Sequence, residues 1–241
     1  MHPLAGGAAR GTPIVRYYWA RFLVAHRGDI RGVALEVGTP ATIKKYAPTA
    51  LDRADALDLV AHSPEVSVVA DLSRASHLPA DTYDCFVNQF TMHVIYDVEA
   101  ALHHSLRVLK AGGVLLINFA CLDYYFARGL DMQTGAPLYV HHWFTPIQVE
   151  NLLRGAGLSS GDFEISVFGN LFAQIAHQLN MSAEELTERE LDFVDDGYPL
   201  LICARAVKPA DWAARVPKPR TPWLPDATPA RWDPVTGHIP R

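Results

Sequence analysis

The stretch that decides the fold runs from Tyr83 to Phe119 and reads YDCFVNQFTMHVIYDVEAALHHSLRVLKAGGVLLINF. Its first apolar run, Cys85–Val87, follows Asp84 and ends at a polar pair, Asn88 and Gln89. A short apolar run between polar residues is typical of a strand that is buried on both faces of a parallel sheet. The stretch therefore begins with a predicted central strand.

A helix is predicted after this strand. Asp97 is placed to cap its first turn, and apolar residues recur at near-helical spacing as far as Leu109. Gly112 and Gly113 then supply a left-handed stop, and Val114–Ile117 makes a second buried strand. Two parallel strands joined by a helix form the right-handed crossover unit of an α/β sheet.

Composition limits the partners that the chain can have. Its 241 residues carry a net charge of -5 and a pI near 6.1, which argues against nucleic acid and favours a small-molecule substrate. The sequence predicts neither a signal peptide nor a membrane span, because it lacks an apolar run of roughly 18 residues. Cys85, Cys121 and Cys203 fall in or beside predicted buried strands, so we interpret them as reduced core residues of a cytoplasmic protein.

A family resemblance rests on the segment RVLKAGGVLLI, residues 107–117. It is similar to the R-x-L-K-P-G-G turn of class I S-adenosylmethionine-dependent methyltransferases of type 11, with Ala111 in place of proline. The resemblance covers roughly residues 13–209 and includes a bacterial subgroup found with glycan and secondary-metabolite genes. It implies a Rossmann-like, doubly wound α/β sheet of seven strands, mostly parallel, with Phe163–Phe168 and Pro199–Val207 as an antiparallel edge hairpin.

The first predicted strand, Val33–Val37, leads into the loop EVGTPATIKKY. The family usually has D/E-x-G-x-G-x-G here, where glycines let the backbone approach the cofactor, and only Gly38 matches that pattern. The resemblance implies that Glu36, Gly38 and Thr39 hold S-adenosylmethionine in the manner of the subgroup. The same residues are also consistent with an ordinary exit from a strand into a loop.

Acidic residues near the ends of the next two strands are candidate contacts for the nucleoside. Asp55, about twenty residues after the loop, is the first choice for the ribose hydroxyls, with Asp58 and Asp52 as competitors. Asp71 and Leu72 follow the third predicted strand and resemble the family's adenine contact. The alternatives are a solvated loop charge or, for Asp71, a helix cap.

The turn after Cys85–Val87 lies where open α/β sheets bind their ligands. Asn88 and Gln89 are predicted cofactor contacts there, and His93 is a candidate base or substrate-orienting residue. A histidine beside an apolar pair is equally consistent with a packed ring.

Two more histidines, His141 and His142, precede a helix that Thr145 is predicted to cap. They are candidates for a general base or for binding an anionic substrate group. The alternative is a solvated loop, because adjacent side chains point in different directions. A metal site is not predicted, since no third ligand has suitable spacing.

The segment Ile14–His26, IVRYYWARFLVAH, predicts a helix before the first strand. Its apolar side is consistent with core packing alone. Arg16 can instead pair with a carboxylate, and phenol rings such as those of Tyr17 and Tyr18 can cover a cationic sulfonium. The subgroup has a similar R-Y-Y-x-x-x-F-L helix, so the resemblance implies that Tyr17 and Tyr18 contact the cofactor.

Three regions are predicted along the chain: a flexible arm at 1–12, the methyltransferase domain at 13–209 and a Pro/Trp-rich tail at 210–241. The prolines of the tail exclude a regular helix or a central strand. Its tryptophans, Trp212, Trp223 and Trp232, predict that it lies along a surface or a partner subunit, which makes a homodimer through the tail a hypothesis. The aromatic stretch 122–138 is a candidate lid or substrate loop.

The predicted function is methyl transfer from S-adenosylmethionine to a small metabolite or sugar-like acceptor in natural product biosynthesis. Oxygen is the first choice of acceptor atom and nitrogen the second. Two alternatives stay open. The scarcity of glycine in the cofactor loop is consistent with a catalytically inactive binding partner in a biosynthetic assembly, and the cofactor's charge could also serve a non-transfer reaction.

Overall fold

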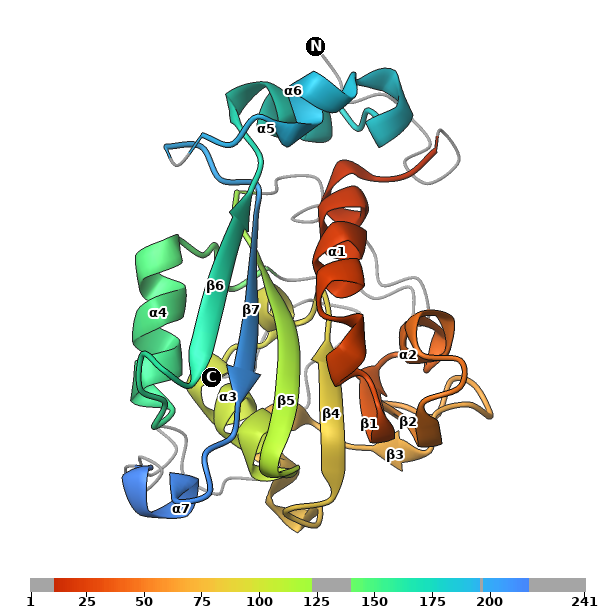
Figure 1. The fold of residues 1–241 in the computed structure, drawn as a ribbon, viewed down its shortest axis with the longest axis vertical. Coiled ribbons are helices and arrows are strands. Elements are labelled where there is room, and N and C mark those ends of the chain that lie inside the picture. Colours follow the sequence, from red (N-terminus) through yellow and green to blue (C-terminus); the bar gives the residue numbers. More distant parts are fainter. Residues whose placement is uncertain (1–10, 123–139, 196, 217–241) are drawn as a thin grey trace, which may run out of the picture.

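The fold is a single mixed sheet with helices on both faces, in a computed structural model that describes residues 11–122, 140–195 and 197–216. Within these residues the sheet has seven strands in the order β3-β2-β1-β4-β5-β7-β6 (Figure 1). Neighbouring strands from β3 to β5 are parallel, whereas β7 is antiparallel to both β5 and β6. The predicted mostly parallel, doubly wound sheet with an antiparallel edge is therefore confirmed.

The boundaries of the elements agree with the sequence in most places. The strands are β1 (Gly32–Val37), β2 (Leu51–Asp58), β3 (Val68–Val69), β4 (Tyr83–Asn88), β5 (Leu109–Ala120), β6 (Phe163–Phe168) and β7 (Leu201–Val207). The α-helices are α1 (Ile14–Ala25), α2 (Ala41–Tyr46), α3 (Val98–Arg107), α4 (Pro146–Gly155), α5 (Leu171–Gln178), α6 (Glu188–Asp192) and α7 (Trp212–Arg215). The short 3-10 helices are η2 (Arg27–Asp29), η3 (Leu72–His77), η4 (Met92–Val94) and η6 (Ala183–Glu185).

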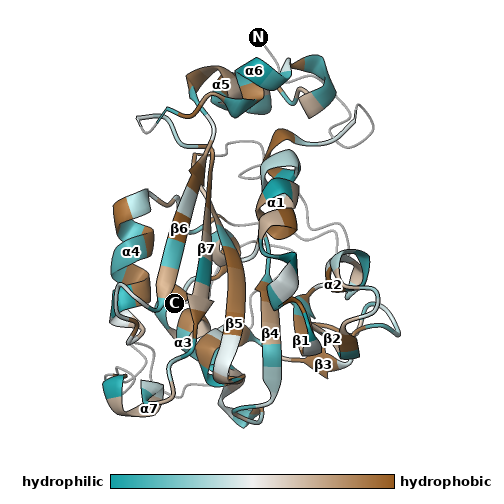
Figure 2. Cartoon of the chain, in the orientation of Figure 1, coloured by the Kyte–Doolittle hydropathy of each residue, from teal (hydrophilic) through white to brown (hydrophobic). Residues whose placement is uncertain are grey.

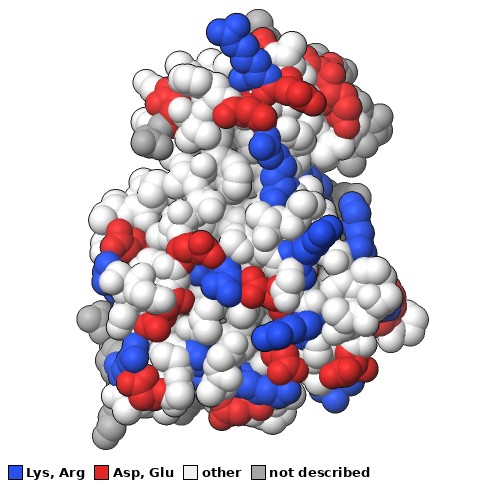
Figure 3. All heavy atoms as spheres, viewed as in Figure 1, with Lys and Arg blue, Asp and Glu red and all other residues white. Residues whose placement is uncertain are grey.

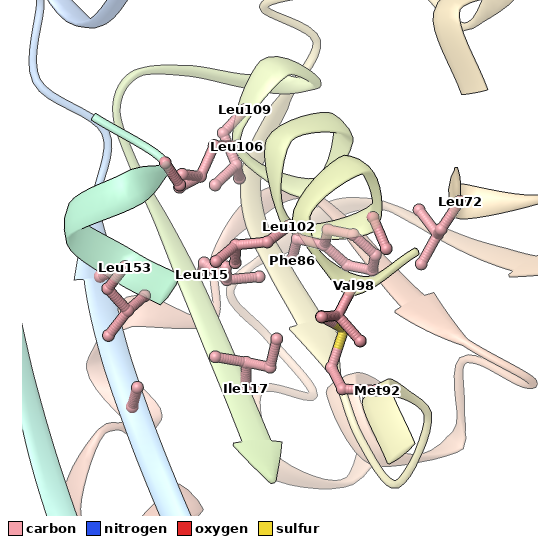
Figure 4. Packing of buried hydrophobic residues seen from close by; sticks show 14 of the residues in the cluster. Leu72, Phe86, Met92, Val98, Leu102, Leu106, Leu109, Leu115, Ile117 and Leu153 are labelled. Carbon is pink, nitrogen blue, oxygen red and sulfur yellow. The ribbon is translucent and has the colours of Figure 1, made fainter. Parts of the chain in front are cut away.

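Two apolar layers hold the helices to the sheet, and hydrophobic segments lie on strands such as β5 (Figure 2). On one face, Trp19 and Phe22 of α1 pack with Val87 of β4. On the other face, Leu102 of α3 lies against Phe86 of β4 (Figure 4). Both faces of β4 therefore meet apolar side chains, as predicted for a strand that is buried in a parallel sheet.

The glycine pair has a different role from the predicted helix stop. Helix α3 ends at Arg107, and Leu109 already pairs with Tyr83 of β4 as the first residue of β5. Gly112 and Gly113 then lie within the irregular start of β5, where the register shifts. The prediction of a helix as far as Leu109 was wrong because pairing with β4 recruits this residue into the sheet.

We expect Gly113→Ala to lower the free energy of unfolding by about 2 to 3 kcal/mol, because an added Cβ would overpack the backbone. That Cβ would lie 2.9 Å from the carbonyl oxygens of both Lys110 and Tyr83, which cannot move aside as side chains do. Gly112→Ala is the matched control: its Cβ would meet open space, and only its φ of +77° would cost about 1 kcal/mol. Urea unfolding of the two variants tests this, and equal losses would contradict it.

Between β6 and β7 the chain forms a cap at the carboxyl end of β5, made of α5, η6 and α6. The Tyr18 hydroxyl of α1 donates to the Leu191 carbonyl at 2.8 Å, and the Asn170 side chain donates to the carbonyls of Glu190 and Phe193. The acidic stretch of residues 183–192 contains η6 and α6, and it gives this end of the molecule its cluster of carboxylates (Figure 3). The cap is thus joined to α1.

The ordered domain extends past the predicted boundary at residue 209. Trp212 is buried, and its indole N–H donates to the carbonyl of Ala156 at 2.8 Å after α4. Lys208 is also buried, so the end of β7 and helix α7 belong to the core. The other two tryptophans of the predicted tail and most of the predicted lid lie outside the described residues.

Candidate active site

Four residues singled out in the sequence lie side by side at one edge of the sheet. Gly38, Asp58, Asp71 and Asn88 stand at or just after the carboxyl ends of β1, β2, β3 and β4. These strands are neighbours in the order β3-β2-β1-β4. The strand order reverses between β1 and β4, and ligands of open α/β sheets bind in the crevice at such a switch point.

Space for a ligand at β1 comes from Gly38. Its φ is +91°, and a Cβ built on it would have no atom within 4 Å. The Gly38 N–H donates to the Leu57 carbonyl at 2.8 Å, which holds the loop beside the end of β2. Thr39 follows directly and is partly buried. One glycine therefore opens the approach here, although the family pattern has three.

The three candidate aspartates of β2 have separate positions. Asp55 lies in mid-strand opposite Leu35, with its carboxylate 3.0 Å from the Arg53 guanidinium. Burial and the negative charge of Asp55 raise the pKa of Tyr83 to about 12. Asp52 lies at the opposite edge, whereas Asp58 ends the strand beside β3. Asp55, the first choice for the ribose contact, thus lies in mid-strand, because β2 runs three residues further than expected.

At the end of β3 the structure gives the capping geometry that the sequence left as an alternative. The Asp71 carboxylate accepts hydrogen bonds from the Ser73 backbone N–H and hydroxyl, at 2.8 and 2.7 Å. Asp71 is exposed and uses one oxygen for both bonds, so the other oxygen stays available. Leu72 is buried in the core, so only its backbone can face a ligand.

Two buried amide groups mark the ends of the central strands. Asn88 Oδ1 and Asn118 Nδ2 have no hydrogen-bond partner among the described residues. The other end of the Asn118 amide accepts from the Phe90 N–H at 2.8 Å. A buried, unsatisfied acceptor is costly unless a ligand or water completes it, so Asn88 fits a ligand-binding position.

Glu36 and Gln89, both predicted to touch the cofactor, are hydrogen-bonded to each other. Gln89 Nε2 donates to Glu36 Oε1 at 2.6 Å and to Thr42 Oγ1 at 3.0 Å, so both amide protons are used. Glu36 is 1% exposed and also accepts from the backbone N–H groups of Thr42 and Ile43. Burial raises the Glu36 pKa to about 7, against the lowering effect of these hydrogen bonds. The contribution of Thr42 could not be inferred from the sequence, because it depends on where α2 begins.

The tyrosines of α1 face the cap. Tyr18 is buried, stacks on Phe168 and donates to the cap, so direct contact with a sulfonium is not what the structure shows for it. The Tyr17 hydroxyl donates to Asp192 at 3.2 Å. Arg16 of this helix also reaches the ligand edge: its exposed guanidinium lies 5.1 Å from the centre of the Phe90 ring.

The three candidate histidines come together beside the end of β4, although almost fifty residues separate them in the chain. The backbone N–H groups of His141 and His142 donate to the His93 carbonyl at 2.8 and 3.2 Å. The Tyr96 ring packs edge-on against the His141 ring at 5.5 Å. No pattern in the sequence pointed to Tyr96. It completes an aromatic and histidine cluster next to the switch point.

The protonation of this cluster can be read from its contacts. His142 Nε2 lies 2.8 Å from the Tyr96 carbonyl, and since a carbonyl only accepts, this nitrogen carries the proton. Partial burial, and then the neighbouring His142, lower the pKa of His141, which favours its neutral form at pH 7. His93 is itself buried in the turn η4. A neutral imidazole at this edge is able to accept a proton.

Two surface cavities lie away from this edge. One of about 460 Å³ opens at the amino ends of the strands, where Lys110 is already paired with both oxygens of Asp84 at 2.8 and 2.7 Å. The other, about 740 Å³, lies on the cap between Phe172 and Phe193. Neither cavity is lined by Gly38, Asp58, Asp71 or Asn88. The candidate site is therefore defined by the polar groups at the switch point.

In the residues placed by the structure, no group of three or more His, Cys, Asp or Glu side chains is arranged to hold a metal ion. Across the same ranges, every helix is too short or too polar to cross a membrane.

Comparison with known proteins gives a family match in the middle of the chain. Residues 37–117 match the model of a family described as "Methyltransferase domain". This range begins at the end of β1 and ends within β5, so it contains the four strand ends described above. No curated protein matches the chain.

Solved structures share the fold at low sequence identity. An S-adenosylmethionine-dependent methyltransferase from Mesorhizobium loti is 19% identical, with a TM-score of 0.51 over 78% of this chain and 96% of its own. Phosphoethanolamine N-methyltransferase 2 of Haemonchus contortus, solved with S-adenosylmethionine, is 15% identical, with a TM-score of 0.53 over 80% of this chain and 53% of its own.

The residues at the switch point fit S-adenosylmethionine. Gly38 leaves open space, Asp58 presents a carboxylate and Asn88 a buried acceptor without a partner among the described residues. These are the donor and acceptor types that an amino-acid and nucleoside ligand requires. Residues 37–117 thus match a methyltransferase domain, and the sheet has the fold of the solved methyltransferases to which the chain is similar.

Proposed function

We propose that the protein methylates an oxygen of a small metabolite or sugar-like acceptor, as in the biosynthesis of natural products. The observation that supports this best is the cluster of His93, His141 and His142 beside the end of β4. A hydroxyl acceptor must lose its proton during transfer, and a neutral histidine is suited to accept it. S-adenosylmethionine, when bound, supplies an electrophilic methyl group on a positively charged sulfur.

The cofactor would lie across the strand ends in the order of the sheet. Asp58 would accept from the ribose hydroxyls, and Asp71 with the Leu72 backbone would contact adenine. Gly38 and Thr39 would allow the amino-acid part to approach β1, and Asn88 would accept a hydrogen bond from it. Their neighbouring positions in the structure support this assignment.

The acceptor would lie on the histidine side of the same edge. Its nucleophile has to be held about 3 Å from the methyl carbon and in line with the breaking bond, which is mainly a matter of positioning. His141 is the first candidate for the base, since its ring is exposed and its pKa is lowered. Arg16, over Phe90, is available to pair with a carboxylate of the cofactor or of the acceptor.

The direct test combines calorimetric titration with S-adenosylmethionine and mass analysis of products from hydroxyl and amine acceptors. We expect binding, and a product one methyl group heavier with a hydroxyl acceptor. His141→Asn is expected to lower kcat by about 100-fold or more, as removal of a general base does. Its dissociation constant for S-adenosylmethionine should stay unchanged, because the histidine faces the acceptor.

Each other outcome has a defined meaning. Absence of cofactor binding would favour an inactive binding partner in an assembly. Binding without any methylated product would favour a non-transfer reaction. A product formed only from amines would show that the acceptor atom is nitrogen and not oxygen. His93, His141 and His142 are each replaced by asparagine in a separate variant. If kcat is unchanged in all three variants, the base assignment is wrong and a carboxylate acceptor is favoured.

We also infer a cytoplasmic location and a homodimer through residues 210–241. The first is supported by three buried thiols, Cys85, Cys121 and Cys203, which are free cysteines. The second rests on the composition of the tail alone.

A further inference from the structure

A chain of hydrogen bonds joins four elements behind the cofactor edge. The indole Nε1 of Trp19 on α1 donates to Gln89 Oε1 at 2.8 Å. Gln89 Nε2 donates to Glu36 Oε1 of β1 at 2.6 Å and to Thr42 Oγ1 at 3.0 Å. Glu36 Oε2 in turn accepts the N–H groups of Thr42 and Ile43, at 2.9 and 3.0 Å. The path therefore runs from α1 to the start of α2.

Chemistry fixes the direction of every bond in this chain. An indole nitrogen can only donate, so the Gln89 side chain must turn its oxygen toward Trp19. Its NH₂ group then faces Glu36 and Thr42. The amide orientation, which is otherwise a matter of assignment, is settled by this neighbour.

Glu36 is suited to this arrangement only as a carboxylate. In that form it accepts three N–H donors, two on Oε2 and one on Oε1. A proton would have to sit on Oε1, since Oε2 already has two donors, and there it would face the Gln89 NH₂ group. The amide would then have to turn over, which would point its NH₂ group at the Trp19 N–H.

The loop that these bonds hold is the one with few glycines. Gly38, Thr39 and Pro40 connect β1 to α2. Glu36 of β1 holds the far end of this connection by accepting the N–H groups of Thr42 and Ile43 at the start of α2. Side-chain hydrogen bonds therefore help to hold a loop that repeated glycines shape in the family pattern. Trp19 of α1 holds the Gln89 end of this set of hydrogen bonds.

We propose that Gln89 is a positioning residue that couples helix α1 to the cofactor loop, by holding Glu36 with an amide whose orientation Trp19 fixes. This inference rests on the proposed cofactor site and adds a regulation to it. Protonation of Glu36 reverses the amide and loosens the loop, so cofactor affinity is higher when Glu36 is ionised.

The charges around Glu36 agree with a transition near neutral pH. Burial raises its pKa to about 7, and Lys44 of α2 is the charged group that lowers it. On α1, Arg16 lies over the ring of Phe90, the residue that follows Gln89 in the chain. Since the carboxylate form binds better, affinity is expected to fall as pH decreases through about 7.

The first test is calorimetric titration of S-adenosylmethionine into Gln89→Met, which keeps the length of the side chain and removes both ends of the amide. We expect the dissociation constant above pH 7 to increase about tenfold, the effect of one hydrogen bond to a charged group. The KM for the cofactor should rise likewise, with kcat at saturating cofactor much less affected. Gln174→Met on α5 is the matched control and should bind as the wild type.

The second test needs no cofactor and follows the indole N–H signal of Trp19 by NMR in isotope-labelled protein, assigned by its loss in Trp19→Phe. In the wild type we expect this signal to titrate near pH 7, and Gln89→Met to abolish the titration. Trp19→Phe frees the amide to turn, so its cofactor affinity should begin to fall at a higher pH than in the wild type. A merely structural contact would not shift that midpoint.

The outcomes separate the inference from the proposed function. Wild-type affinity in Gln89→Met, or a Trp19 signal that does not respond to pH, would overturn the coupling even if the enzyme methylates its acceptor. Failure of the wild type to bind S-adenosylmethionine at any pH would overturn the proposed function. The Trp19 titration would still decide whether Glu36 and Trp19 are coupled through Gln89.

Discussion

Asp58→Asn is expected to weaken S-adenosylmethionine binding by about 10- to 100-fold, because a hydrogen bond to a charged acceptor contributes about 1.5 to 3 kcal/mol. Asp58 ends β2 beside the Gly38 loop, and its carboxylate is partly exposed. Its Oδ1 accepts from the Leu59 N–H at 2.6 Å, and its Oδ2 lies 3.5 Å from His62 Nδ1. Asparagine keeps the shape of the side chain but provides one acceptor oxygen where the ribose offers two hydroxyl protons. Calorimetric titration with the cofactor measures the change.

Asp55→Asn is the matched control on the same strand. Its carboxylate faces Arg53 and Tyr83, so the substitution should affect stability and leave the dissociation constant within about threefold of the wild type. If Asp55→Asn weakens binding and Asp58→Asn does not, Asp55 in mid-strand makes the ribose contact and the proposed arrangement is wrong. Thermal unfolding of both variants separates loss of binding from loss of the fold.

Lys208→Met should lower the free energy of unfolding by about 2 to 4 kcal/mol, although lysine to methionine keeps the apolar stem. Lys208 is 5% exposed, and its ammonium donates to the carbonyls of Leu109 and Arg107 at 2.6 and 3.1 Å. It also lies 4.9 Å from the centre of the Trp212 ring. Removing the ammonium leaves the buried carbonyl of Leu109 without this donor, and urea unfolding measures the cost.

The ion pair of Lys208 with Asp81, at 2.7 Å, contributes much less. The Asp81 side chain is 66% exposed, so solvent screens the pair, and Asp81→Asn should cost less than about 1 kcal/mol. A loss in Asp81→Asn as large as that in Lys208→Met would show that the pair, and not the carbonyl contacts, stabilises this corner.

Much of the fold could be predicted because it is encoded locally. The apolar run Cys85–Val87, the cap at Asp97 and the strand Phe163–Phe168 each depend on neighbours in the chain, and the structure has an element at each place. Period and capping act over a few residues, so a single sequence is enough to show them.

The structure differs from the local pattern where a distant segment competes with local preference. Leu109 continues a helical pattern but pairs with Tyr83 in the sheet, which moves the glycine pair from a helix end into a strand. Asp55 has the right separation from the cofactor loop, yet β2 continues to Asp58 because β1 and β3 pair with its last residues. Tyr18 follows a family motif, but the cap supplies a carbonyl for its hydroxyl.

The sequence by itself determined the class of fold and placed the candidate site at the carboxyl edge of the sheet, since both follow from elements with local signals. Only the tertiary structure decided which side chains face that edge. It brought His93 to His141, turned Glu36 and Gln89 toward each other and left Asn88 Oδ1 without a partner among the described residues. The reason is physical: a hydrogen bond depends on distance and direction to within a few tenths of an ångström, and the chain order does not contain that geometry.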